Sequence, residues 1–173
     1  MPDTPDYLHR IRELAAGSDP LSAQAQTPLI LAELTVGVSD ERMRIRPSAG
    51  KWSIGEIVAH LAEDEIASAW RYRQMVEHSG IELPGFDQEM WAKTGNYAGR
   101  DPQESLALFR LLRHANLEFL RGLSAEQWNC FGIHAERGHI TVRDLAAHMV
   151  GHDANHLDQI RKILSRVIQI PGL

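Results

Sequence analysis

The stretch TVRDLAAHMVGHDANHLDQIRKILSRV, residues 141–167, decides the fold and points to a site. Its apolar residues recur at intervals of three and four, the period of one face of an α-helix. His148, His152 and His156 follow one another every four residues inside this pattern. Four residues advance only about 40° around a helix, so His152 and His156 project on nearly the same bearing. Imidazoles among apolar side chains cost desolvation unless something coordinates or hydrogen-bonds them, so the pattern favours a bound metal ion.

Start and stop signals predict three more long helices. Asp19 followed by Pro20 marks an N-cap and a first turn for a helix that ends near Val36. The segment 53–56, SIGE, has capping-box spacing and opens a helix that ends around residues 79–80. The segment 101–104, DPQE, combines a cap, a proline and an acid in the same way. That helix is predicted to end near Gly122, and residues 1–18 are a candidate for one extra short helix.

The remaining segments show no sustained period. Residues 80–100 are predicted to form a long loop, and a loop of that length is usually functional or poorly ordered. Residues 127–140 are predicted to be irregular. Without strand alternation, the sequence predicts an all-α four-helix bundle that forms a single domain over residues 1–173. The apolar stripe of its third helix is predicted to consist of Leu108, Leu112, Ala115 and Phe119, with Phe109 and Leu120 beside it.

Composition narrows the range of partners. The chain has 173 residues, 43% of them hydrophobic, which is enough for one core. Its net charge is −5 and its basic residues are scattered, so we expect no nucleic-acid partner. No apolar run approaches the roughly 18–20 residues that span a bilayer, and the N-terminus lacks a signal-peptide pattern. We therefore expect a cytoplasmic protein without a membrane partner.

A third metal ligand is predicted on the second helix. His60 lies between Ile57 and Leu61, so its ring can face the same interior as His152 and His156. Three neutral imidazoles with an open fourth position are typical of a catalytic zinc site, although imidazole also suits nickel, iron and copper. The other interpretation is that these are hydrogen-bonded core histidines without a metal. His148 is expected to flank the site.

Carboxylates lie close to the predicted ligands in the sequence. Asp64 follows His60 by one turn and is our candidate general base. Asp153 follows His152 directly, and a carboxylate at such a place can orient a metal-bound imidazole. Glu63 and Glu65 are expected to lie on a solvated helix face, as acidic runs usually do.

Four stretches together resemble the DinB and YfiT-like superfamily of candidate metal-dependent hydrolases. They are GKWSIGEIVAHLAEDE (50–65), PGFDQEMWA (84–92), FLRGLSAEQW (119–128) and GHITVRDLAAHMVGHDANHLDQI (138–160). The resemblance extends from about residue 20 to residue 167. Its most specific parts are the tryptophan-led helix that carries His60 and the pair His152 and His156.

The resemblance implies a bundle in up-down-down-up order, with a crossover between the second and third helices. It also implies nickel or zinc held by the three histidines, and a homodimer. Related members include enzymes that depend on mycothiol or bacillithiol. One hypothesis is therefore a metal-dependent hydrolase, or a thiol-dependent transferase or isomerase, acting on a small molecule. The alternative is a non-catalytic, stress-related dimer that binds a metal or a small ligand.

Overall fold

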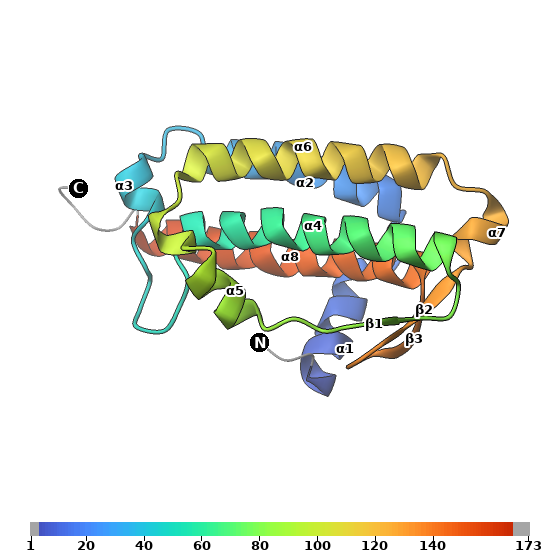
Figure 1. Cartoon of the computed structure of the whole chain (residues 1–173). Coiled ribbons are helices and arrows are strands. Elements are labelled where there is room, and N and C mark those ends of the chain that lie inside the picture. The colour runs from blue at the N-terminus through green and yellow to red at the C-terminus, as the bar shows by residue number, and fades with distance from the viewer. Residues whose placement is uncertain (1–3, 168–173) are drawn as a thin grey trace.

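Four long helices form the bundle in the computed structural model, which describes residues 4–167 and the side chains of residues 4–166 (Figure 1). They are α2 (Pro20–Thr35), α4 (Ile54–Glu77), α6 (Pro102–Arg121) and α8 (Val142–Val167). The short elements are α1 (Pro5–Ala15), α3 (Asp40–Met43), α5 (Gln88–Thr94), the 3₁₀ turn η1 (Tyr97–Gly99), α7 (Ala125–Trp128), β1 (Ile81–Leu83), β2 (Phe131–His134) and β3 (Gly138–Thr141). The predicted helical bundle is confirmed. None of the described helices is long and apolar enough to cross a membrane.

The helix starts follow the capping signals in the sequence. The Asp19 carboxylate accepts a hydrogen bond from the backbone of the first turn of α2, and Asp101 does the same for α6. Ser53 forms a complete capping box at the start of α4. Thr141 and Asp144 exchange side-chain-to-backbone hydrogen bonds at the start of α8, with N···O distances of 2.9 and 3.0 Å. Each cap satisfies N–H groups that have no partner inside the helix.

The helix directions are those that the resemblance implied. In Figure 1, α2 and α8 run in one direction and α4 and α6 in the other. The contacts between α2 and α8 agree, because Gln24 bonds to the Ala146 carbonyl and Thr27, further along α2, bonds to Asp153. Two consecutive parallel helices, α4 and α6, require the chain to return along the bundle between them. Residues 78–101 make that return.

Both segments predicted to lack regular structure contain some. The crossover holds β1, α5 and η1, and residues 131–141 form a β-hairpin. Strand β1 pairs parallel with β2, and β2 pairs antiparallel with β3, in a small sheet of order β1-β2-β3. Gly132 permits this pairing because a Cβ there would meet the Leu83 side chain and the Ile81 carbonyl. The prediction of irregular chain was wrong because three-residue and four-residue strands carry too few residues to show alternation.

The buried face of α6 differs from the predicted stripe, although it includes Phe109 and Leu120, which were expected beside that stripe. Leu108 is 38% exposed and Ala115 faces solvent. The buried positions are Pro102, Ser105, Phe109, Arg113, Asn116, Leu117 and Leu120. They share one helix face, rotated from the predicted stripe by about one residue. Three of them, Ser105, Arg113 and Asn116, are polar, so the most apolar stripe in the sequence was not the buried one.

The N-terminal helix α1, proposed as an extra element, crosses α8 at Gly151. A Cβ at residue 151 would collide with the backbone carbonyl of Ile11. Glycine therefore allows the two helices to touch backbone to backbone at this point. The contact brings α1 over the face of α8 that carries the histidines.

Candidate metal centre

The three predicted ligands converge in the middle of the bundle. His60 comes from α4, and His152 and His156 come from the antiparallel neighbour α8. His152 Nε2 lies 3.1 Å from His60 Nε2 and 3.2 Å from His156 Nε2. All three ligand nitrogens lie within 4.8 Å of one another. The side chains are buried, so the site is shielded from bulk water on most sides.

Local structure explains this convergence. The capping box at Ser53 fixes the start of α4, and His60 follows in the second turn on the face that packs against α8. The i, i+4 spacing on α8 sets the two rings one turn apart, with centroids 4.5 Å apart. The Trp52 ring packs on His60 with centroids 5.0 Å apart and limits the positions of that imidazole.

Hydrogen bonding determines which nitrogen of His156 faces the cluster. Its Nδ1 lies 3.2 Å from Gln159 Oε1, which can only accept, so Nδ1 carries the proton and Nε2 presents a lone pair. His152 Nδ1 lies 3.6 Å from the Asp64 carboxylate, just beyond hydrogen-bond distance, and has no hydrogen-bond partner within the described part of the chain. A small shift of either side chain would complete a carboxylate–histidine pair of the kind that orients metal ligands.

The donor set fits a shared cation. His152 Nε2 lies close to two other nitrogens, the Nε2 atoms of His60 and His156. A proton on His152 Nε2 could form a hydrogen bond to only one of them, whereas a cation between the rings could bind all three Nε2 atoms. Burial lowers the pKa of His60 well below its usual range, and the neighbouring imidazoles lower it further. Burial and His152 likewise lower the pKa of His156, against the opposing effect of Gln159. Neutral imidazole is the form that binds metal ions.

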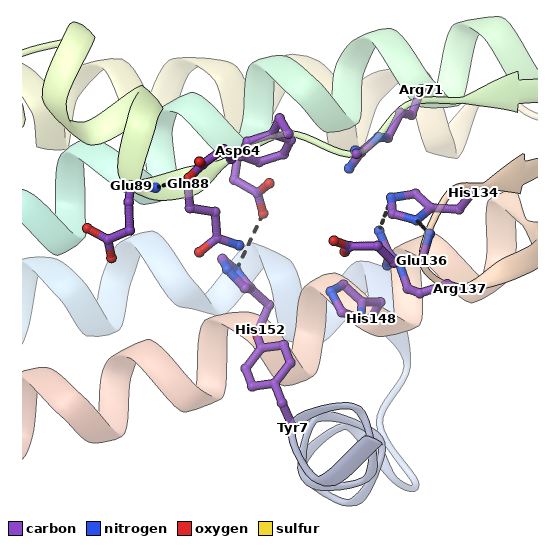
Figure 2. Close-up of a pocket in the computed structure, with 13 residues that line it drawn as sticks. Tyr7, Asp64, Arg71, Gln88, Glu89, His134, Glu136, Arg137, His148 and His152 are labelled. Atoms are coloured by element: carbon purple, nitrogen blue, oxygen red, sulfur yellow. Dashed lines mark hydrogen bonds and ion pairs between the residues drawn. The ribbon is translucent and has the colours of Figure 1, made fainter. Parts of the chain in front are cut away.

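Two cavities reach the cluster. The first, which we call the hairpin cavity, has a volume of about 400 Å³ and lies between α4, α5, the β-hairpin and α8 (Figure 2). His152 and Asp64 line it. The second, the α3–α4 loop cavity, has a volume of about 370 Å³ and is lined by residues 47, 48 and 50–52 and by His156. Tyr7, Gln88 and Glu89 line both cavities. The histidine cluster thus has small-molecule-sized spaces on two sides.

The acidic run on α4 separates into three environments. Asp64 lines the hairpin cavity beside His152. Glu63 is half-buried and pairs with Arg100, with Oε1 2.6 Å from Nη2. Glu65 is buried and pairs with Arg113, so its predicted place on a solvated face was wrong. Successive helical residues point about 100° apart, which accounts for the separation.

Asp153 does not orient a histidine. Its carboxylate turns away from the cluster and binds the buried Arg113 guanidinium at 2.5 and 3.0 Å, and it accepts a hydrogen bond from Thr27 at 2.7 Å. Arg113 also bonds to Glu65 at 2.8 Å. This buried network joins α2, α4, α6 and α8 behind the face of α8 that carries His152 and His156.

One expected residue and several unexpected ones lie beside the cluster. His148 flanks the cluster as expected, with its ring centroid 6.3 Å from that of His152. Arg71 of α4 lines the same cavity, together with His134, Glu136 and Arg137 of the hairpin. Their one sequence signal is the short pattern FGIHAERGHIT at 131–141, two β-prone runs around a turn that ends in glycine.

Comparisons with known proteins show what the chain is similar to. Residues 25–160 match the family model described as the DinB superfamily. A candidate metal-dependent hydrolase of Oceanobacillus iheyensis is 24% identical over 135 residues, 78% of this chain and 78% of that protein. YfiT of Bacillus subtilis, with the same description, is 22% identical over 143 residues, 82% of this chain and 80% of YfiT. Helix α1 lies outside the matched family range.

Two solved structures share the fold. The structure of YfiT, described as having an unusual four-helix bundle topology, superposes with a TM-score of 0.78 at 22% identity and covers 85% of each chain. A mycothiol-dependent maleylpyruvate isomerase superposes with a TM-score of 0.58 at 12% identity, covering 89% of this chain and 60% of that one. At these identities the likeness shows the fold alone.

Proposed function

The chain belongs to the DinB superfamily, and from that premise we propose that it is an enzyme that acts on a small molecule with the help of a divalent metal ion. The proposed ligands are His60, His152 and His156. The proposed reaction is hydrolysis, or a transfer or isomerisation that uses a low-molecular-weight thiol. One observation carries the proposal: three buried Nε2 atoms converge where two cavities meet.

Nickel or zinc is the proposed ion, because neutral imidazoles suit both. A divalent ion held there would supply Lewis acidity, which makes water or a thiol a nucleophile near neutral pH. The chain's own groups prepare the ligands for this role. Gln159 holds the proton of His156 on Nδ1 and so keeps Nε2 available, and Trp52 fixes the His60 ring.

Asp64 is the proposed general base. Its carboxylate lines the hairpin cavity, within reach of a molecule bound beside His152. The same carboxylate is 3.6 Å from His152 Nδ1, so it can also hold that ring in place. A carboxylate that faces both a ligand and the substrate space can accept the proton that a nucleophile loses.

An open side of the site supports an enzyme over a purely binding protein. In residues 4–166, the grouping of potential ligands around His60, His152 and His156 contains no fourth His, Cys, Asp or Glu. Structural zinc sites are closed by four protein ligands, whereas catalytic sites keep a position for water or substrate. His152 lines one of the two cavities and His156 lines the other, so a water or substrate molecule could approach the histidines from either cavity.

Metal analysis of tag-free protein tests the proposal. Plasma mass spectrometry should find about one equivalent of nickel or zinc in the wild type, after reconstitution if necessary, and none in the His152→Ala, His156→Ala double variant. His114→Ala is the matched control because it removes an exposed histidine of α6. Metal-free wild type after reconstitution, or equal metal in the double variant, would defeat the proposal. Loaded protein is then assayed for hydrolysis and for thiol transfer.

Two further expectations stay predictions. The family resemblance predicts a homodimer, and the composition predicts a cytoplasmic location. Size-exclusion chromatography with light scattering would test the first.

A further inference from the structure

The α3–α4 loop cavity extends along α8 away from the histidine cluster. Six of the residues that line it share one side of α8: Asn155, His156, Gln159, Lys162, Ile163 and Arg166. Each helical residue advances about 1.5 Å along the axis, so Lys162 lies about 9 Å and Arg166 about 15 Å beyond His156. The α3–α4 loop, residues 44–53, lies beside this end of α8 (Figure 1). The cavity therefore has an inner end at His156 and an outer end near the C-terminus of α8.

Part of the wall of this cavity is apolar. Ile57 of α4 and Ile163 of α8 line the cavity and belong to the buried core of the bundle. Trp52 also lines it, packs against the same core and lies beside the His60 ring. An apolar group placed against such a wall leaves water favourably, so the wall favours a ligand with an apolar body. The volume of about 370 Å³ suits a small molecule.

Three basic residues line the same cavity. Lys51 comes from the α3–α4 loop, and Lys162 and Arg166 come from successive turns of α8. All three residues are exposed, whereas His156 is buried, so the charged groups belong to the open part of the cavity. Lys51 and Arg166 form no ion pair within residues 4–166. Their two charges are therefore available to a ligand.

The nearby carboxylates do not balance these three charges. Lys162 Nζ lies 2.7 Å from Asp158 Oδ2, but Arg10 Nη2 lies 3.0 Å from the same oxygen, so Asp158 is shared between two cations. Among the described residues that line the cavity, Glu89 is the one carboxylate. Three lining cations thus face one lining carboxylate, an excess of two positive charges. A cleft lined mainly by one sign of charge attracts and orients a ligand of the opposite sign.

We propose that the α3–α4 loop cavity binds an elongated small molecule that has an apolar body and an anionic end. The anionic end binds at Lys51, Lys162 and Arg166. The apolar body lies along Trp52 and Ile163, and the opposite end of the molecule reaches the histidine cluster. The proposal rests on the proposed function, because it names the substrate class of the same site. A carboxylate and a phosphate share the required charge, so the experiment compares them.

Hydroxamates of matched length test the proposal in the full-length, metal-loaded protein. Suberic monohydroxamic acid carries a metal-binding hydroxamate at one end and a carboxylate at the other, whereas octanohydroxamic acid has the same chain without the carboxylate. Isothermal titration calorimetry should show about fivefold tighter binding of the first compound, the gain expected from exposed ion pairs. Succinic monohydroxamic acid is too short to span the distance of about 9 Å from His156 to Lys162, so it should gain nothing over butyrohydroxamic acid.

Two basic residues should account for most of this gain. The Lys51→Met, Arg166→Met double variant should reduce the advantage of suberic monohydroxamic acid to about twofold or less. Arg161→Met is the matched control, because Arg161 is an exposed arginine of α8 that does not line the cavity, and it should keep the full advantage. The three substituted residues are exposed, so the variants should fold. An equal advantage in the wild type and the double variant would overturn the proposal, as would equal affinity of the wild type for the two long hydroxamates.

Metal-free protein separates this proposal from the one on which it rests. There, octanoate or octyl phosphate should bind more tightly than uncharged octanamide, and the Lys51→Met, Arg166→Met double variant should remove the difference. The tighter binder of the two anions identifies the anionic group. Failure of both anions to bind more tightly than octanamide would overturn the proposal. Wild type that takes up no metal would defeat the proposed function, whereas loaded wild type without a carboxylate advantage would defeat the anion site alone.

Discussion

Replacement of Asp153 by alanine should destabilise the protein substantially while leaving the metal site intact. Asp153 accepts two hydrogen bonds from the Arg113 guanidinium, at 2.5 and 3.0 Å, and one from the Thr27 hydroxyl at 2.7 Å. Arg113 and Asp153 are almost completely buried. Arg113 keeps its bond to Glu65 at 2.8 Å in the variant, so it does not become a fully unpaired charge.

The magnitude follows from the bonds that are lost. Each hydrogen bond to a charged group contributes at least about 1.5 kcal/mol, so the two from Arg113 give about 3 kcal/mol. Removal of one partner of a buried ion pair typically costs about 3–5 kcal/mol. Because Glu65 still neutralises the arginine, we expect the lower end, a loss of about 3 kcal/mol in the free energy of unfolding.

Urea denaturation followed by far-ultraviolet circular dichroism measures this loss. Glu118→Ala is the control: Glu118 forms an exposed ion pair with Arg121, and such pairs contribute at most about 1 kcal/mol. Combining Asp153→Ala with Arg113→Met should cost less than the sum of the single losses, because the pair interacts directly. A loss below about 1 kcal/mol in Asp153→Ala, or strict additivity in the double variant, would refute the reasoning. Metal content should be unchanged, because Asp153 faces away from the histidines.

Two other predictions concern the helix crossing and the buried histidines. Gly151→Ala places a Cβ against the Ile11 carbonyl, so α1 should separate from α8 and its backbone amides should exchange hydrogen faster by mass spectrometry; unchanged protection of residues 5–15 would contradict this. In metal-free protein the pKa values of His60 and His156 are lower in the folded state than in the unfolded state, where a histidine has a pKa of about 6.5. Below that pH the unfolded chain therefore binds more protons than the folded protein. Stability should therefore be full above that pH and fall below it, by up to about 1.4 kcal/mol per pH unit for each histidine; a urea midpoint equal at pH 7.5 and pH 5.5 would exclude this.

The four long helices could be predicted because their signals are local. The caps at Asp19, Ser53 and Asp101 lie within one turn of the residues that they bond. The i, i+4 pair on α8 is likewise fixed by its own helix. Placing His60 beside that pair required only that the apolar faces of α4 and α8 meet, which the bundle architecture makes the expected arrangement.

The hairpin and the buried face of α6 could not be predicted, because both depend on distant partners. Strand β1 consists of residues 81–83 and pairs with residues 132–134, about fifty positions later. Arg113 is buried because Asp153 and Glu65 come from two other helices to meet it. An arginine without such partners belongs at the surface, so no local pattern identifies it as a core residue.

On α4 and on α8, one of two neighbouring residues lies in the buried ion-pair network and the other lies at the candidate site. On α4, Glu65 enters the buried network while Asp64 faces the hairpin cavity; on α8, Asp153 enters the same network while His152 faces the cluster. Each pair differs by one position and therefore by about 100° around its helix. The network thus fixes the rotation of α4 and α8 about their axes at the level where the histidines meet. The proposed ligands would need positions held to within about 0.5 Å, and a buried ion-pair network one residue away provides that restraint without blocking the cavities.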